Sequence, residues 1–290
     1  MNVLLQGATD ASNRRYELAV TLVASCPLAL GRAIALTGSV ARGTADEASD
    51  IELNCWVEEL PSADARASWL RAAGASDVLL DADAIADGSL WATCRVGRTW
   101  IEIGWQTIAA QDALLSAIRA GQVMDRGRLV IASILAQAVA LRDADLIAHW
   151  QQALADYPAV LQARLISAAT EVWTFPHLLA ARWALVQRED QFALAQRLVG
   201  GVQDALRILY AINRRWEPYE KWTAMTIETL PIKPDHLAAR IDAVFVAPRP
   251  AERLAVCLTL LRDTLMLVPP PYDVTRAIAT IDASLRVHGA

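Results

Sequence analysis

The stretch Leu36–Leu53, L-T-G-S-V-A-R-G-T-A-D-E-A-S-D-I-E-L, carries the pattern that decides the fold of this chain. An apolar run at Ala33–Thr37 predicts a short strand, which ends at the turn residues Gly38 and Ser39. After ten further residues, Asp50–Val57 alternates between polar and apolar side chains and predicts a second strand. Two strands joined through a glycine-serine turn indicate the core of a small domain built around a sheet.

The second predicted strand carries two acids at alternate positions. Asp50 and Glu52 are two residues apart, so their carboxylates project from the same face of the strand, about 7 Å apart. The intervening Ile51 and the following Leu53 point to the opposite face, towards a core. Two acids this close repel each other unless a cation lies between them. We expect Mg²⁺, which binds through one or two carboxylates together with substrate phosphates.

The glycine-serine turn supplies groups that suit a phosphate. Gly38 allows a close approach of the backbone, and Ser39 adds a hydroxyl and an amide N–H at the start of a predicted helix. Arg42 lies one turn further on and could bind a phosphate oxygen with two N–H groups, or could be an ordinary surface charge. Ser49, directly before the first acid, is a further candidate donor.

A third carboxylate stands on a predicted hairpin, whose strands at Trp91–Val96 and Thr99–Gln106 flank a tight Gly-Arg turn. Within the run W-I-E-I-G-W, Glu102 is a carboxylate on an otherwise apolar strand. Because a buried acid is costly without a partner, we expect a metal-binding or catalytic role, or an ion pair with Arg95 or Arg98. Trp100 and Trp105 flank this acid and are candidates for stacking on a base or sugar, whereas most of the ten tryptophans suit a core.

The pattern of the sequence changes near Ile108. Before it, short strands alternate with helical patterns, without the regular crossover helices of a doubly wound sheet. After it, long Ala/Leu/Arg-rich stretches with proline at the joins are typical of helices. We predict an α+β protein, with a mixed or antiparallel sheet in a domain at residues 1–108 and an all-α helical bundle at residues 109–290.

These motifs resemble those of the polymerase β-like nucleotidyltransferase superfamily: a Gly-Ser turn, a spacer, Asp-x-Asp/Glu on the next strand, and a later third carboxylate. The positions Gly38, Ser39, Asp50, Glu52 and Glu102 match that pattern one by one over roughly residues 30–106. With an all-helical carboxy-terminal half, the chain is most similar to aminoglycoside- and lincosamide-type nucleotidyltransferases and their uncharacterised bacterial relatives. Glu52 stands where many members have Asp, which puts the metal geometry in question.

The resemblance implies an activity and a set of partners. It implies transfer of a nucleoside monophosphate, with ATP as the expected donor, to a hydroxyl of a small acceptor bound between the two domains, with release of pyrophosphate. Two Mg²⁺ ions would be held by Asp50 and Glu52, and Glu102 would complete the site and take the proton of the acceptor. Gly38, Ser39, Arg42, Ser49 and Lys221 would bind the nucleotide. A protein or RNA acceptor, as in toxin–antitoxin-like systems, and a catalytically lapsed NTP-binding regulator remain alternatives.

A second cluster lies in the helical half. Its sequence at Asn213–Trp222, N-R-R-W-E-P-Y-E-K-W, resembles a segment of those uncharacterised relatives. Lys221 is one of only two lysines, and in such enzymes a lysine of the helical domain can reach the triphosphate; alternatively, it could pair with Glu217 four residues earlier. Asp204 and Tyr219, together with the asparagine that begins the segment, are further candidates for the wall of the cleft.

Composition excludes several classes of protein. The 290 residues are 54% apolar and 20% charged, which excludes a disordered chain. We expect no membrane span, because charged residues interrupt every long apolar run, and no secretory signal at the amino terminus. Four dispersed cysteines fit reduced thiols in a cytoplasmic protein rather than a zinc site or disulfides. A net charge of −5 makes nucleic acid an unfavourable partner.

Overall fold

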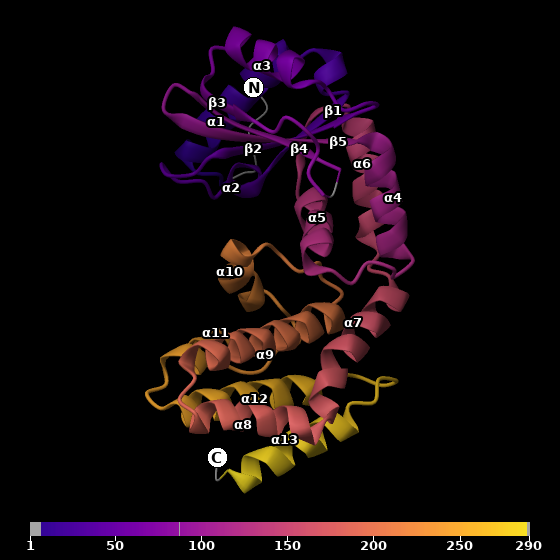
Figure 1. Cartoon of the computed structure of the whole chain (residues 1–290). Helices are drawn as coiled ribbons and strands as arrows, with labels where there is room; N and C mark the ends of the chain where they lie inside the picture. Colours follow the sequence, from indigo (N-terminus) through magenta and orange to yellow (C-terminus); the bar gives the residue numbers. More distant parts are fainter. Residues whose placement is uncertain (1–6, 87, 289–290) are drawn as a thin grey trace. The chain divides into compact units, whose positions relative to one another are not determined.

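The computed structural model describes residues 7–86 and 88–288, and within them the α+β class predicted from the sequence is confirmed (Figure 1). Residues 1–6, on which part of the expectation about a secretory signal rests, lie outside the described residues. The chain forms two compact units. One contains the described residues up to Ala117 together with Ile131–Asp156, and the other contains Ile118–Val130 and the chain from Tyr157 onward.

The first unit is built on a six-stranded mixed sheet in the order β3-β4-β5-β2-β1-β6. The central β2 and β5 are parallel, and each of the other neighbouring pairs is antiparallel. The predicted hairpin of β4 and β5 is confirmed. The strands are β1 Ala33–Thr37, β2 Ile51–Val57, β3 Ser76–Leu80, β4 Leu90–Val96, β5 Thr99–Thr107 and β6 Val139–Arg142.

One face of this sheet is the hydrophobic core of the unit. Alternate residues of the central strands, such as Ile51, Leu53, Ile101 and Ile103, are at most 1% exposed and pack beneath helices α1 (Asp10–Ser25) and α3 (Ala63–Ala72). Burying each such side chain stabilises the fold by about 1.5–3 kcal/mol. The alternation that places these residues in the core places Glu52 and Glu102 on the other face.

Part of the other face is covered by α4 (Ile108–Arg119) and α6 (Ala144–Ala155). The ring of Trp56 on β2 lies 5.0 Å from that of Trp150, and its indole N–H donates to the buried Gln111 side chain at 3.0 Å. These contacts lie at the carboxyl end of β2. Glu52 lies at the opposite, amino end of β2, away from these contacts.

Strand β6 lies in a stretch that the sequence analysis expected to be helical. Its run V-A-L-R resembles the surrounding helices in composition, but it pairs antiparallel with β1. The guanidinium of Arg142 fastens it by donating to the backbone oxygens of Val23, Cys26 and Gly31 at 2.7–2.8 Å. The two compact units each consist of two chain segments that alternate along the sequence. The single domain boundary between residues 108 and 109 stays a prediction.

The second unit is helical. Its long helix α9 (Gln191–Ile212) packs against α7 (Ala159–Glu171) and α12 (Pro250–Met266). The close approach of α9 to α12 requires glycine, because a Cβ on Gly201 would stand 2.7 Å from the Sγ of Cys257. Proline begins α8 and α12, as the sequence predicted for helix joins. Among the described helices, none has the length and apolarity needed to cross a membrane. Helix α5 (Arg126–Ala136) is divided between the two units after Val130. The other helices of the second unit are α8 Pro176–Gln187, α10 Thr223–Glu228, α11 Leu237–Val246 and α13 Thr275–Val287.

Candidate active site

Two of the predicted site residues are direct neighbours across the sheet. Glu52 on β2 and Glu102 on β5 are register partners of the parallel pair, so their side chains leave the same face from strands about 4.8 Å apart. The row continues through the register partners Thr37 on β1 and Thr93 on β4. The sheet therefore brings together two carboxylates that are fifty positions apart in the sequence.

Asp50, the third predicted acid, directly precedes β2. Its side chain is half-buried, as are those of Glu52 and Glu102. Within the residues that the structure describes, no group of three or more His, Cys, Asp and Glu side chains is placed to hold a metal ion. The assignment of these three acids as metal ligands therefore stays a prediction.

Gly38 lies against the carboxylate of Glu52. It begins the short helix α2 (Gly38–Ala41) with φ +67, a conformation that favours glycine. A Cβ at this position would stand 2.5 Å from the Cδ of Glu52 and 2.6 Å from both of its oxygens. Only a residue without a side chain allows the turn and the carboxylate to approach this closely.

Two polar residues that the sequence analysis did not single out fix the strands beside the acids. The Asn54 amide donates to Thr37 Oγ1 at 3.0 Å, and this hydroxyl lies 3.4 Å from the backbone oxygen of Glu52. Thr37 is only 2% exposed. The spacing of Asn54 two residues after Glu52 was the available signal, because it places both side chains on one strand face.

Arg42 follows α2 and lies near Glu52. Burial lowers the pKa of its guanidinium, and the nearby negative charge of Glu52 opposes that shift. The guanidinium also donates to the Gln137 side chain. The structure thus places a half-buried cation next to the second acid, where the sequence analysis left open a surface charge.

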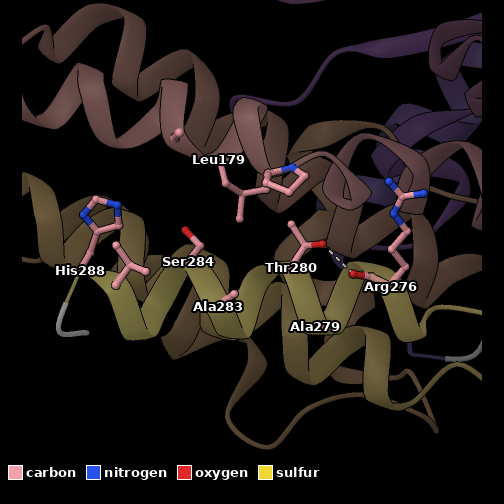
Figure 2. Close-up of a pocket in the computed structure, with 10 residues that line it drawn as sticks. Leu179, Arg276, Ala279, Thr280, Ala283, Ser284 and His288 are labelled. Atoms are coloured by element: carbon pink, nitrogen blue, oxygen red, sulfur yellow. Dashed lines mark hydrogen bonds between the residues drawn. The ribbon is translucent and has the colours of Figure 1, made fainter.

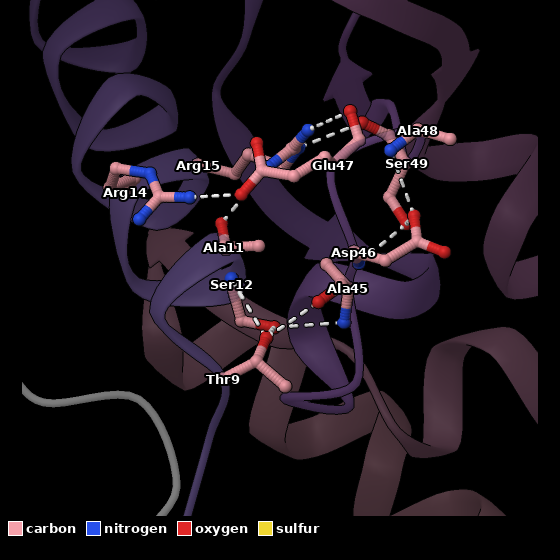
Figure 3. Close-up of polar contacts among 10 residues, drawn as sticks. All are labelled: Thr9, Ala11, Ser12, Arg14, Arg15, Ala45, Asp46, Glu47, Ala48 and Ser49. Carbon is pink, nitrogen blue, oxygen red and sulfur yellow. Dashed lines mark hydrogen bonds and ion pairs between the residues drawn. The ribbon is translucent and has the colours of Figure 1, made fainter.

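The segment that leads to Asp50 is held by the start of α1 (Figure 3). Arg15 donates from Nε to the backbone oxygen of Ser49 at 2.7 Å and from Nη2 to that of Glu47 at 2.8 Å. Ser12 accepts the backbone N–H of Ala45 at 2.9 Å. These bonds position the loop without using any of the predicted site carboxylates.

The two serines expected to bind phosphate are differently placed. Ser39 is 8% exposed, and its backbone oxygen accepts the N–H of Thr44 at 3.0 Å. The hydroxyl of Ser49 donates to the carboxylate of Asp46 at 2.8 Å and accepts the backbone N–H of the same residue at 3.0 Å. The nucleotide-binding roles given to both serines stay predictions.

The aromatic residues around Glu102 divide between the two faces of the sheet. Trp105 is fully buried in the core, where its indole N–H donates to the oxygen of Leu30 at 2.8 Å, so stacking on a ligand by this residue was a wrong expectation. Trp100 is 48% exposed and its ring lies 5.4 Å from the guanidinium of Arg95. Trp91, on the neighbouring strand, covers Gly104, where a Cβ would meet its ring at 3.1 Å.

The cluster at the end of α9 belongs to the helical unit. Arg126 at the start of α5 pairs with the carboxylates of Glu217 and Glu220 and donates to the oxygen of Pro218 at 3.2 Å. The Lys221 amine lies 5.7 Å from the ring of Trp222. Since this lysine and the three acids belong to different compact units, its contact with a triphosphate stays a prediction.

The other residues proposed for a cleft wall have structural contacts. Asn213 donates to the oxygens of Leu209 and Ile232 at 2.8 and 2.7 Å, and accepts the Ile232 N–H at 2.9 Å. Asp204 accepts the indole N–H of Trp173 at 3.0 Å, and burial raises the pKa of its carboxyl to about 6. Tyr219 is half-exposed.

Comparison with known proteins adds a family of unknown function. A family described as a domain of unknown function, DUF4037, matches residues 124–223, which is about a third of the chain and includes both Arg126 and the segment Asn213–Trp222. No curated protein matches the chain. Among solved structures, the chain is similar to a nucleotidyltransferase-like protein from Exiguobacterium sibiricum 255-15, with 10% identity and a TM-score of 0.42, over 88% of this chain and 76% of that one. A likeness of this size does not define a family for this chain.

Proposed function

We propose that this protein is a Mg²⁺-dependent nucleotidyltransferase that moves a nucleoside monophosphate, with ATP as donor, to a hydroxyl of a small acceptor. The observation that carries the proposal is the pairing of Glu52 and Glu102 on adjacent parallel strands, with the Gly38 turn against the first of these carboxylates. The turn proposed to bind phosphate and the carboxylates proposed to bind metal thus lie at one end of the sheet, which supports the proposal.

The donor set suits Mg²⁺ in its chemistry. Mg²⁺ takes oxygen ligands and commonly uses only one or two carboxylates, leaving positions for water and substrate phosphates. Asp50 and Glu52 would hold the metal and Glu102 would complete the site. Bound there, Mg²⁺ would neutralise phosphate oxygens and stabilise the negative charge that develops on the leaving pyrophosphate.

The residues of the chain would each have a separate task in the reaction. The backbone at Gly38 and Ser39 would approach the phosphates, and the guanidinium of Arg42 would exchange its amide partner for a phosphate oxygen. The acceptor oxygen would form a bond to the α-phosphorus as the bond from that phosphorus to the pyrophosphate oxygen breaks. Glu102 would accept the proton that the acceptor hydroxyl loses.

The net charge of the chain favours one class of acceptor over another. A net charge of −5 gives the chain no electrostatic attraction for RNA. A small, uncharged or cationic molecule with a free hydroxyl meets no such penalty, so we propose an acceptor of that class.

Calorimetric titration with ATP, in the presence and absence of Mg²⁺, tests the donor site without knowledge of the acceptor. We expect binding that requires Mg²⁺ in the native chain and is lost in Asp50→Asn. The matched control is Asp64→Asn, which removes the same charge from the exposed first turn of α3, on the core side of the sheet. Equal binding by both variants, or no binding of ATP or any other NTP to the native chain, would contradict the proposal.

A further inference from the structure

The helical unit contains a pocket that the proposed reaction does not use. It has a volume of about 500 Å³ and lies along α8, with contributions from α9 and from the 3₁₀ turn at Val172–Thr174. Three arginines line it: Arg182 from α8, Arg188 directly after the end of α8, and Arg197 from α9. Apolar side chains, among them Val172, Leu178 and Leu185, form the rest of the wall.

Arg182 is the most firmly placed of the three arginines. Its guanidinium lies 4.3 Å from the ring of Trp173, and its Nη1 donates to the backbone oxygen of Leu178 at 2.9 Å. Its Nε–H is enclosed and has no hydrogen-bond acceptor among the described residues. A buried donor in this state is costly unless a ligand or ion satisfies it.

The positive charge of the pocket is poorly balanced by the chain itself. None of the three arginines forms a salt bridge with a carboxylate in the described part of the chain, and Arg182 and Arg197 lie close enough to repel each other. The nearby carboxylate of Asp204 offsets part of the charge of Arg182, but it also faces Arg207 and accepts the indole N–H of Trp173. An incoming anion would relieve this repulsion.

We propose that this pocket binds a phosphomonoester that carries an apolar substituent. Guanidinium groups form paired hydrogen bonds with phosphate oxygens, and a dianion suits several arginines better than a carboxylate does. The apolar wall would cover the substituent, which gives the ligand affinity beyond that of free phosphate. The site consists only of residues of the helical unit and is independent of the proposed transferase site.

A second cavity of the same unit provides an internal control. It has a volume of about 410 Å³ between α8 and α13 and is lined by Leu179, Thr280 and Ser284, among others, with Arg276 as its single arginine (Figure 2). At its other end the imidazole of His288 stacks on Trp183 at 4.2 Å. Size and apolar lining are therefore similar in the two cavities, while the number of arginines differs.

Calorimetry with hexyl phosphate tests the proposal. The test variant Arg188→Gln/Arg197→Gln changes two exposed side chains, so it should fold normally, and thermal unfolding without ligand checks this. We expect hexyl phosphate to bind at least about tenfold more tightly than inorganic phosphate, and the double variant to weaken it by about tenfold or more. The control Arg276→Gln should change the affinity less than about twofold. Hexylamine should not bind.

Four outcomes would overturn the proposal. Unchanged affinity in the double variant, or a loss in Arg276→Gln as large as in the double variant, would place the anion elsewhere. Binding of hexylamine as tight as that of hexyl phosphate would show that the pocket recognises the alkyl chain and not the phosphate. Loss of hexyl phosphate binding in Asp50→Asn would show that the probe occupies the proposed transferase site. Failure of ATP to bind to the native chain would contradict the proposed function alone, because the arginine pocket does not depend on it.

Discussion

Replacing Gly38 by alanine separates a backbone effect from an effect on the carboxylate site. At φ +67 an alanine costs roughly 1–2 kcal/mol of stability. Its Cβ would also stand 2.5 Å from the Cδ of Glu52. Since carbon contacts are optimal near 3.5–4.0 Å, the carboxylate would have to move by about 1 Å. The carboxylate ends a flexible side chain, so we expect this movement to add little to the loss of stability.

The matched control is Gly97→Ala in the hairpin turn between β4 and β5. Gly97 has φ +60, and a Cβ there would meet nothing within 4 Å. Urea denaturation should therefore show similar losses of stability in both variants, about 1–2 kcal/mol each. Titration with MgATP should distinguish them, because losing an interaction with a charged group costs about 1.5–3 kcal/mol, which corresponds to roughly a 10- to 100-fold loss of affinity. We expect that loss in Gly38→Ala alone.

Two results would refute this reasoning. Native MgATP affinity in Gly38→Ala would mean that the contact between the turn and Glu52 has no part in nucleotide binding. Equal loss of affinity in Gly97→Ala would attribute the effect to general destabilisation of the sheet unit. A stability loss in Gly38→Ala well above that of the control would show instead that Glu52 cannot move aside.

Three further predictions concern stability and thiol reactivity. Burial raises the pKa of Asp204 from 3.8 to about 6, so the folded chain binds this proton more tightly than the unfolded chain does. The protonated carboxyl therefore contributes about 3 kcal/mol to the free energy of unfolding below about pH 4, and this contribution is lost as the pH rises through 6. Asp204→Asn should therefore gain stability over the native chain in urea denaturation at pH 7.5 but not at pH 4, and an equal effect at both would contradict the assignment. Replacing Arg126 by methionine should destabilise the helical unit by about 3 kcal/mol, because Glu217 is then nearly buried without its cation. The control Arg249→Met removes a cation from an exposed ion pair and should cost under about 1 kcal/mol. Thermal and urea unfolding compare the two variants. Burial raises the pKa of Cys257 to about 12, so iodoacetamide should label it only after unfolding, and rapid labelling of the native chain, followed by mass spectrometry, would contradict its placement.

Local patterns in the sequence predicted much of the sheet unit. Alternation placed Glu52 opposite Ile51 and Leu53, and the Gly-Arg dipeptide predicted the hairpin of β4 and β5. The same alternation also indicated that Trp105, three residues from Glu102, leaves the opposite face, although the sequence analysis did not use it. Such features depend only on the period of a strand, which neighbouring residues determine.

Longer-range relations required the tertiary structure. No local pattern states that β2 and β5 are neighbours, that their register aligns Glu52 with Glu102, or that β6 joins β1 after a long helical stretch. Register between strands depends on packing of the whole sheet against its helices. The arginine pocket likewise exists only because α8 and α9 fold back on each other.

The sequence by itself therefore determined the kinds of chemical group at the candidate site and the strand faces from which they project. The tertiary structure decided which groups meet: the Gly38 turn with the carboxylate of Glu52, that carboxylate with Glu102, and Arg182 with Arg197. The physical reason is range, because side-chain direction along a strand follows from adjacent peptide units, whereas contacts between distant segments follow from burial of the whole core.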